Sequence, residues 1–114
     1  MIQLTPEEVE EYKDVPLVFN LDTGFYSFPP NPDGIIKLAL HAAGYVNTVK
    51  VHSDMEDVSV PKTKLTPGFE DGFIPEEIVP VLRKLFREQY PKLGEKPFVQ
   101  SRMCWYCDTP SGDW

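Results

Sequence analysis

The feature that most constrains the fold is the density of proline, with twelve prolines in a chain of 114 residues. Each proline fixes its own φ angle and lacks the backbone N–H that a helix interior or a central strand needs. The chain is therefore expected to be cut into short elements, with several fixed turns. A chain of this length is expected to form one domain with a modest core.

Composition and charge narrow the functional classes. Hydrophobic residues make up 41% of the chain and aromatic residues 12%, which is typical of a globular protein. The net charge of −7 argues against sequence-independent binding of nucleic acid, which needs clustered Lys and Arg. No apolar run approaches the roughly twenty residues that span a bilayer, and the acidic start is unlike a secretory signal. An intracellular protein is expected, without membrane or nucleic acid as partners and with reduced cysteines.

The first part of the chain predicts one short helix followed by an antiparallel meander. Thr5 is the expected N-cap, with Pro6 at the first helical position and Glu8 completing a capping box, and the helix should end near Tyr12. Apolar and aromatic runs separated by Asn, Asp and Gly predict three strands, over 16–20, 24–28 and 35–41.

The third of these strands carries two candidate functional side chains. Because side chains alternate between the two faces of a strand, Ile36, Leu38 and Leu40 should face the core. Lys37 and His41 should then share the other face. A lysine in mid-strand is either on a solvated sheet surface or in a cleft, and the pattern leaves both open.

The second part of the chain predicts one further strand and the main helix. Residues 45–51 predict the strand, and the helix should begin near Ile74-Pro75 and end before Pro91. Pro80 should make the first turn kinked or 3₁₀, while Arg83 and its charged neighbours should face solvent. The helix should present a mostly apolar stripe, formed by Ile78, Leu82, Leu85, Phe86 and Gln89. The expected fold is α+β, a mostly antiparallel sheet of about four to five strands with one main packing helix and a short N-terminal helix.

A last strand is expected over 98–110, bracketed by Pro97 and Pro110. Because side chains alternate, the even-numbered residues of this strand should share one face and the odd-numbered residues the other. The first face comprises Phe98, Gln100, Arg102, Cys104 and Tyr106. A guanidinium, a thiol and a phenol in register suggest a purpose beyond packing.

Cys104 and Cys107 have the C-x-x-C spacing of thioredoxin-type redox pairs and of half a zinc site. Positions three apart on an extended strand face opposite ways, and nothing in the sequence completes a zinc site, so redox or metal chemistry is disfavoured. Two interpretations stay open, namely buried thiols that act as small hydrophobes and one thiol that acts as a covalent anchor. The seven glycines are dispersed, with no G-x-G-x-x-G turn for a nucleotide.

Two segments in the right order resemble the sarcosine oxidase family of FAD-dependent amine oxidases, which includes the fungal saccharopine, pipecolate and fructosyl amino acid oxidases. The stretch Gly34-Ile35-Ile36-Lys37-Leu38-Ala39-Leu40-His41 is similar to the strand with the oxygen-activating lysine. The stretch Ser101-Arg102-Met103-Cys104-Trp105-Tyr106-Cys107-Asp108-Thr109-Pro110, with Gly112-Asp113-Trp114, is similar to the flavin-attachment segment.

This resemblance implies a role for five residues. Cys104 would be joined to the 8α carbon of FAD, and Lys37 would hold a water against flavin N5 and assist oxygen reduction to hydrogen peroxide. Tyr26, His41 and Tyr106 would line the substrate side of the flavin. Cys107 has no implied role.

Two departures from the family pattern refine the expectation. Without the dinucleotide fingerprint, residues 1–114 would be a single, incomplete substrate-binding domain, an internal fragment of a larger oxidase that is inactive and without FAD when isolated. Fructosyl amino acid oxidases carry an acidic residue in the segment matching Tyr26-Ser27-Phe28-Pro29, which here has none. The implied substrate is therefore a secondary amino acid of the sarcosine, pipecolate or saccharopine type.

The expected partners are the remainder of the parent flavoenzyme and a small amino acid, in the cytoplasm or the peroxisome. Exposed apolar faces and strand edges would let the fragment associate with itself. The alternative function is a non-catalytic acidic α+β interaction domain, whose partner surface is formed by Phe25, Tyr26, Phe28, Trp105 and Tyr106.

Overall fold

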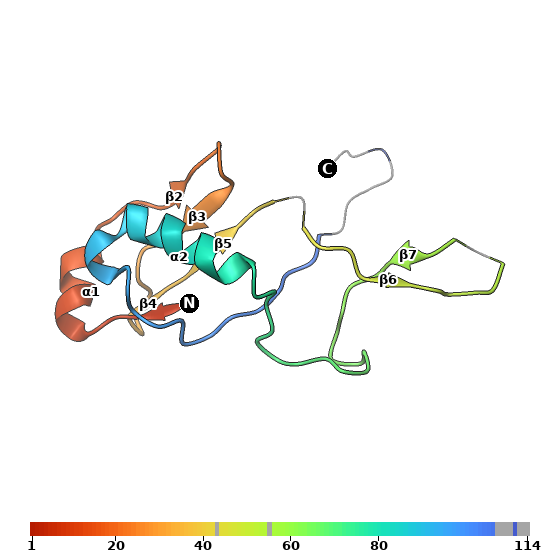
Figure 1. The fold of residues 1–114 in the computed structure, drawn as a ribbon. Helices are drawn as coiled ribbons and strands as arrows, with labels where there is room; N and C mark the ends of the chain where they lie inside the picture. Colours follow the sequence, from red (N-terminus) through yellow and green to blue (C-terminus); the bar gives the residue numbers. More distant parts are fainter. Residues whose placement is uncertain (43, 55, 107–110, 112–114) are drawn as a thin grey trace. The chain divides into compact units, whose positions relative to one another are not determined.

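The computed structural model describes residues 1–42, 44–54, 56–106 and 111 (Figure 1). By internal contacts the chain forms two compact units. The first comprises Met1–Gly44 and Ile74–Ser101, and the second comprises Tyr45–Phe73 and Arg102–Trp114. No helix in the described ranges is long and apolar enough to cross a membrane. The assignment of the chain to one substrate-binding domain stays a prediction.

Helix α1 (Pro6–Tyr12) begins as predicted. The backbone N–H of Glu8 donates to the Thr5 hydroxyl at 3.3 Å, and the Thr5 N–H donates to the Glu8 carboxylate at 2.7 Å. This reciprocal capping box is confirmed, and it satisfies two backbone donors that the first turn would leave unpaired. Leu4 is buried just before the helix, and Val9 packs against the core cluster.

The predicted meander is confirmed as the antiparallel sheet β2-β3-β5. Its strands are β2 (Val18–Phe19), β3 (Phe25–Ser27) and β5 (Leu38–Leu40). A second antiparallel pair joins β1 (Ile2–Gln3) to β4 (Ile35–Ile36). Within the first unit, Figure 1 shows β2 and β3 side by side, next to β5.

Strands β4 and β5 belong to one extended segment interrupted only at Lys37. Ile36 pairs with Ile2, and Leu38 pairs with Ser27. Ile2 also forms an isolated bridge with Phe98. The two small sheets therefore share this segment. Neighbouring strands pair in the order β2, β3, β4–β5 and β1, and β1 in turn pairs with Phe98. This arrangement confirms the predicted α+β class with mostly antiparallel pairing.

Helix α2 (Ile78–Gln89) starts four residues later than residue 74, where it was predicted to begin. The N–H groups of Ile78 and Val79 donate to the carbonyls of Pro75 and Glu76, both at 3.2 Å. These bonds span three residues, so the expected 3₁₀-like first turn is present before the regular helix. The helix ends at Gln89 with Tyr90 as its C-cap, and a 3₁₀ turn, η1 (Pro91–Leu93), follows it.

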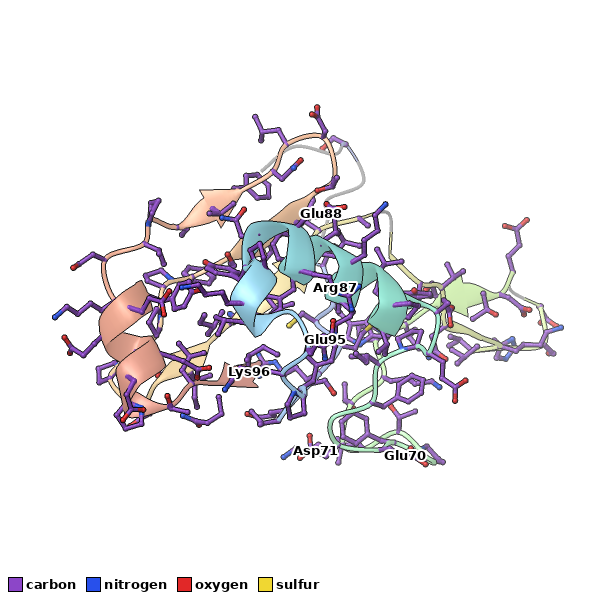
Figure 2. The ribbon with its side chains drawn as sticks, turned by 60° about the vertical axis from the view of Figure 1, so that its left-hand side comes forward. Glu70, Asp71, Arg87, Glu88, Glu95 and Lys96 are labelled. Atoms are coloured by element: carbon purple, nitrogen blue, oxygen red, sulfur yellow. The ribbon has the colours of Figure 1, made fainter. Side chains whose placement is uncertain are left out.

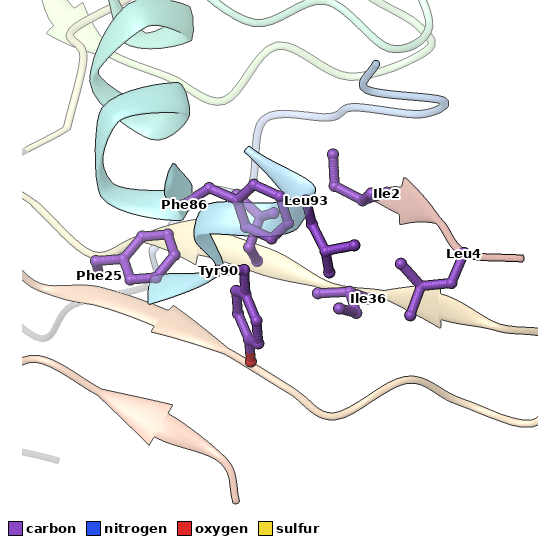
Figure 3. Packing of buried hydrophobic residues seen from close by; sticks show 8 residues of the cluster. Ile2, Leu4, Phe25, Ile36, Phe86, Tyr90 and Leu93 are labelled. Carbon is purple, nitrogen blue, oxygen red and sulfur yellow. The ribbon is translucent and has the colours of Figure 1, made fainter. Parts of the chain in front are cut away.

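The hydrophobic core lies between α2, η1 and the paired strands of the first unit (Figure 3). Its buried residues are Ile2, Leu4, Phe25, Ile36, Leu38, Phe86, Tyr90 and Leu93. Leu82 and Leu85 of the predicted helix stripe pack against this cluster. Ser27 is also fully buried, and its hydroxyl lies 3.2 Å from that of Tyr90, so both polar groups have a partner.

The prediction that Arg83 faces solvent is wrong. Its Nη1 donates to the carbonyl oxygens of Gly94 at 2.9 Å and Lys96 at 2.6 Å. Its guanidinium carbon lies 4.1 Å from the centre of the Phe98 ring. The helical pattern predicts that a charged side chain opposite the apolar stripe is exposed. A long Arg side chain can nevertheless lie along an apolar surface and donate to carbonyls beyond it. Arg87 keeps the expected exposed position and pairs with Glu95 (Figure 2).

In the second unit, the strand predicted over 45–51 is reduced to β6 (Thr48–Val49), which pairs with β7 (Val58–Ser59). The prediction of a continuous strand over 98–110 is wrong for its described part. Only Phe98 has a bridge partner, and residues 100–106 have no regular secondary structure. A β-propensity describes how well side chains fit a pleated surface, and a strand also needs a neighbouring strand to pair with. Residues 107–110 lie outside the described residues.

Candidate functional site

The sheet β2-β3-β5 turns one face to the core and one face away from it. Phe25, Ser27 and Leu38 are buried, whereas Tyr26 between them is half-buried and Lys37 is exposed. Phe19 pairs with Tyr26, and Tyr26 pairs with Ala39, so these three side chains share the second face. We call this surface the outer face, and it comprises Phe19, Tyr26, Phe28, Lys37, Ala39 and His41.

A row of aromatic rings runs along the outer face. The ring centres of Phe19 and Tyr26 are 6.0 Å apart, and those of Tyr26 and Phe28 are 5.9 Å apart, both edge to face. The ammonium of Lys37 lies 5.4 Å from the centre of the Phe28 ring. Edge-to-face rings and a cation over a ring face are both favoured by the ring quadrupole. The row therefore ends in a positive charge.

Lys37 is held in its place by the backbone as well. The N–H of Phe28 donates to the Lys37 carbonyl at 2.9 Å, which continues the pairing of β3 beyond its regular end. Of the two environments left open by the sequence, the described chain places the Lys37 side chain in an exposed position over aromatic carbon.

His41 follows β5 and is exposed. Its N–H donates to the carbonyl of Gly24 at 2.9 Å, which keeps the strand in register with the turn before β3. Gly24 has φ +75°, a conformation that L side chains rarely adopt. By strand alternation from Lys37 and Ala39, His41 shares the outer face. The pairing thus brings Tyr26 and Lys37 to one face. Strand alternation assigns His41 to the same face, and its position there stays a prediction.

Cys104 and Tyr106 lie in the second unit, on a segment without regular secondary structure. Arg102, Cys104 and Tyr106 are exposed, while the intervening Met103 and Trp105 are half-buried. The two predicted faces are therefore distinct here even without a paired strand. Cys104 is a free, exposed thiol, so it is not a buried hydrophobe. Cys107 lies outside the described residues.

The partner surface proposed for a binding module needs one correction. Phe25 is only 3% exposed because it belongs to the core, and it cannot contribute to a surface. Phe19 was missed by the sequence analysis, although it is 49% exposed and continues the aromatic row. The signal that could have found it is its position opposite Tyr26 once the 20–24 turn fixes the register.

The described residues suit FAD only in part. An exposed thiol can form a covalent bond to a cofactor, and the outer face offers aromatic surface and a cation. No glycine-rich phosphate turn exists in the sequence. Among the residues whose placement is described, no three His, Cys, Asp or Glu side chains group as a metal site would need.

Comparison with known proteins relates this chain to oxidases, although no protein-family model matches it. It is 33% identical to L-saccharopine oxidase of Schizosaccharomyces pombe over 113 residues, which cover 95% of this chain and 24% of that protein. Amino acid oxidase imqH of Aspergillus flavus is 28% identical over 139 residues, covering 98% of this chain and 28% of its own length.

Solved structures agree with this result. The crystal structure of the deglycating enzyme fructosamine oxidase from Aspergillus fumigatus (Amadoriase II) matches with a TM-score of 0.78 and 36% identity. The match covers 95% of this chain and 24% of the enzyme. A thermally stable mutant of fructosyl peptide oxidase matches with a TM-score of 0.77, 31% identity, and coverage of 95% of this chain and 25% of the mutant.

The chain is therefore related in sequence and in fold to a family of oxidases. That family is the one containing L-saccharopine oxidase and the fructosyl amino acid oxidases, so the resemblance drawn from the two motifs is confirmed. The chain spans about a quarter of the length of the relatives it matches. The roles of individual residues stay predictions.

Proposed function

We propose that the chain is part of the substrate-binding domain of an FAD-dependent oxidase. The reaction is oxidation of the C–N bond of a secondary amino acid to an imine, with two electrons passing through FAD to oxygen, which takes up two protons to give hydrogen peroxide. The observation that carries the proposal is the outer face, where Lys37, Tyr26 and His41 share one surface in a chain related to L-saccharopine oxidase.

Each proposed residue has a chemical reason for its role. The Lys37 ammonium would stabilise negative charge as it develops on oxygen, and it would hold a water beside the bound flavin. Tyr26, His41 and Tyr106 orient the substrate amine through aromatic contact and hydrogen bonds. The Cys104 thiol anchors FAD, which supplies the electron transfer when bound. Because this chain lacks a phosphate-binding turn, FAD binding requires the remainder of the parent enzyme, and the isolated chain is inactive.

The lack of a carboxylate on the outer face favours an N-alkyl or cyclic amino acid over a fructosyl amine as substrate. Its six residues include one lysine and one histidine but no carboxylate, and the segment 26–29 has none either. A fructosyl amine presents several sugar hydroxyls, for which a carboxylate is an effective hydrogen-bond acceptor. We therefore propose an N-alkyl or cyclic amino acid, of the sarcosine, pipecolate or saccharopine type, as substrate.

The visible spectrum after acid precipitation tests this function. The chain alone and a longer protein containing it, completed with the remaining three quarters of the oxidase, are compared after acid denaturation. A yellow pellet from the longer protein and a colourless pellet from the chain are expected. Cys104→Ala should move the colour into the supernatant, whereas Cys107→Ala should leave it in the pellet. A protein that contains no flavin in either form would instead favour the non-catalytic interaction domain.

A second experiment separates the two half-reactions. Lys37→Met should slow reoxidation of the reduced flavin by oxygen far more than its reduction by substrate. Rapid-mixing spectrophotometry at the flavin absorption band measures each step separately. Equal slowing of both steps would remove the proposed role of Lys37.

A further inference from the structure

We infer that Phe28 is a positioning residue for Lys37, one that holds the ammonium over the outer face. This inference rests on the proposed function of Lys37. Phe28 is the residue that contacts Lys37 in two independent ways, through its backbone and through its ring.

The backbone contact fixes where the lysine side chain begins. The Phe28 N–H donates to the Lys37 carbonyl at 2.9 Å, beyond the last regular pair of β3 and β5, Ser27 with Leu38. Lys37 also falls between two paired stretches, because β4 ends at residue 36 and β5 begins at residue 38. Both neighbouring pairs and this bond therefore hold the Lys37 backbone, so its Cβ leaves the sheet on the outer face.

The ring contact fixes where the side chain ends. A lysine side chain has several rotatable bonds, and an exposed one samples many rotamers. The Phe28 ring face lies 5.4 Å from Nζ, and the ring itself is packed edge to face against Tyr26. Phe28 is 37% exposed and Lys37 is exposed, so the contact lies at the protein surface. The ring thus favours one set of lysine rotamers without desolvating the charge.

The size of the effect follows from the strength of the contact. A cation over a ring face at an exposed site favours the stacked state by about two- to fivefold. Phe28→Leu keeps an apolar side chain and the backbone N–H but removes the ring face. We expect it to lower the rate constant of flavin reoxidation by about two- to fivefold and to change reduction by substrate less. Phe28→Trp provides a larger ring face and should retain the wild-type reoxidation rate.

The control is Phe19→Leu, at the other end of the aromatic row. Phe19 is exposed and contacts Tyr26 but has no ring contact with Lys37 among the described interactions. Phe19→Leu should leave unchanged the ratio of the flavin reoxidation rate to the rate of flavin reduction by substrate. If Phe19→Leu and Phe28→Leu lower that ratio equally, or if Phe28→Trp behaves as Phe28→Leu does, Phe28 acts only by packing and the inference is wrong.

A measurement on the chain alone separates this inference from the proposed function. Nuclear Overhauser contacts between the Lys37 ε-methylene and the Phe28 ring protons, with an upfield ring-current shift of that methylene, are expected in the wild-type chain. Phe28→Leu should remove the shift, and Phe19→Leu should preserve it. An unshifted methylene in the wild type overturns the inference even if Lys37→Met proves Lys37 catalytic. If the methylene is shifted but Lys37→Met leaves the reoxidation rate of the longer protein unchanged, the proposed role of Lys37 is wrong instead.

Discussion

The carbonyl of His41 occupies the space in which a side chain at position 24 would lie. A Cβ built on Gly24 would be 1.9 Å from the His41 oxygen, and Gly24 also has φ +75°. Position 24 is therefore restricted to glycine for two separate reasons, backbone conformation and close approach of the next strand. This relationship links the turn before β3 to a residue proposed to face the substrate.

Gly24→Ala should destabilise the first unit more than its backbone strain alone explains. The strained φ alone costs on the order of 1–3 kcal/mol, and relief of the clash must also separate the strand end from the turn. The matched control is Gly68→Ala, because Gly68 has φ +74° with no atom within 4 Å of its Cβ position. Urea denaturation of both variants measures the difference, and equal losses would show that the chain accommodates a Cβ at position 24.

Arg83→Met should lower the free energy of unfolding by about 1–3 kcal/mol, since it leaves two partly buried carbonyls without their charged donor. The same change removes the guanidinium from the face of Phe98. Arg87→Met is the control on the same helix, because Arg87 pairs with Glu95 at the surface, where ion pairs contribute about 0–1 kcal/mol. A comparison of urea midpoints tests the prediction, and it is wrong if the two variants are equally stable.

The ion pair between Glu8 and Lys96 should make stability depend on acid pH. The Lys96 ammonium, followed by the N–H of Thr5, holds the pKa of the Glu8 carboxyl below its ordinary value. A lowered folded-state pKa means that its stabilisation is present above the unfolded-state pKa and is lost as the pH falls through the folded value. Glu8→Gln should therefore destabilise by about 0.5–1 kcal/mol at neutral pH and by less in acid.

Urea midpoints measured at several values between pH 7 and pH 2 check this sign. Glu88→Gln is the control, because Glu88 and Lys84 are exposed and 3.9 Å apart. The difference between wild type and Glu8→Gln should shrink as the pH falls, and a constant difference would contradict the role of the carboxylate.

Cys104 should be modified in the native chain almost as fast as in the unfolded chain, because its thiol is exposed. In a Cys107→Ser background, the rate of iodoacetamide alkylation can be followed by mass spectrometry with and without denaturant. Rates within about tenfold of each other are expected. Protection well beyond that would mean that the thiol is covered in solution.

The isolated chain is expected to associate with itself. Leu21 is 83% exposed near the edge strand β2, and Leu65 is 94% exposed in the second unit. Such side chains and an unpaired strand edge favour contacts between copies. Sedimentation velocity over a range of concentrations should show the association, and Leu21→Ser with Leu65→Ser should weaken it. A concentration-independent monomer would contradict the prediction.

Local signals predicted most of the first unit. The Thr5 capping box, the turn at residues 20–24 and the alternation around Lys37 act within a few residues, so the sequence displays them directly. The late start of α2 at Ile78 was harder to predict because several proline and acidic positions suit a helix start equally. Element boundaries depend on small differences in local energy.

Signals that depend on a partner could not be read in the same way. Residues 100–106 have strand-like composition but no described neighbouring strand. Exposed and half-buried side chains alternate along residues 101–106, but no strand pairing is present there. Arg83 was assigned to solvent because its carbonyl partners, Gly94 and Lys96, lie beyond the end of its own helix. For the candidate site, the shared face of Lys37 and His41 was predictable from alternation, whereas the ring row needed the pairing of Phe19 with Tyr26.

The position of Ile2 between Ile36 and Phe98 has a consequence for the order of folding. The meander joins neighbouring stretches of chain and has low contact order, so it can form early. The Ile2–Phe98 bridge closes a loop from residue 2 to residue 98. The entropy cost of closing this loop is offset only when the residues on both sides of the bridge are also ordered. We therefore expect the core around Ile2 to be completed after the meander, and with it the outer face, has formed.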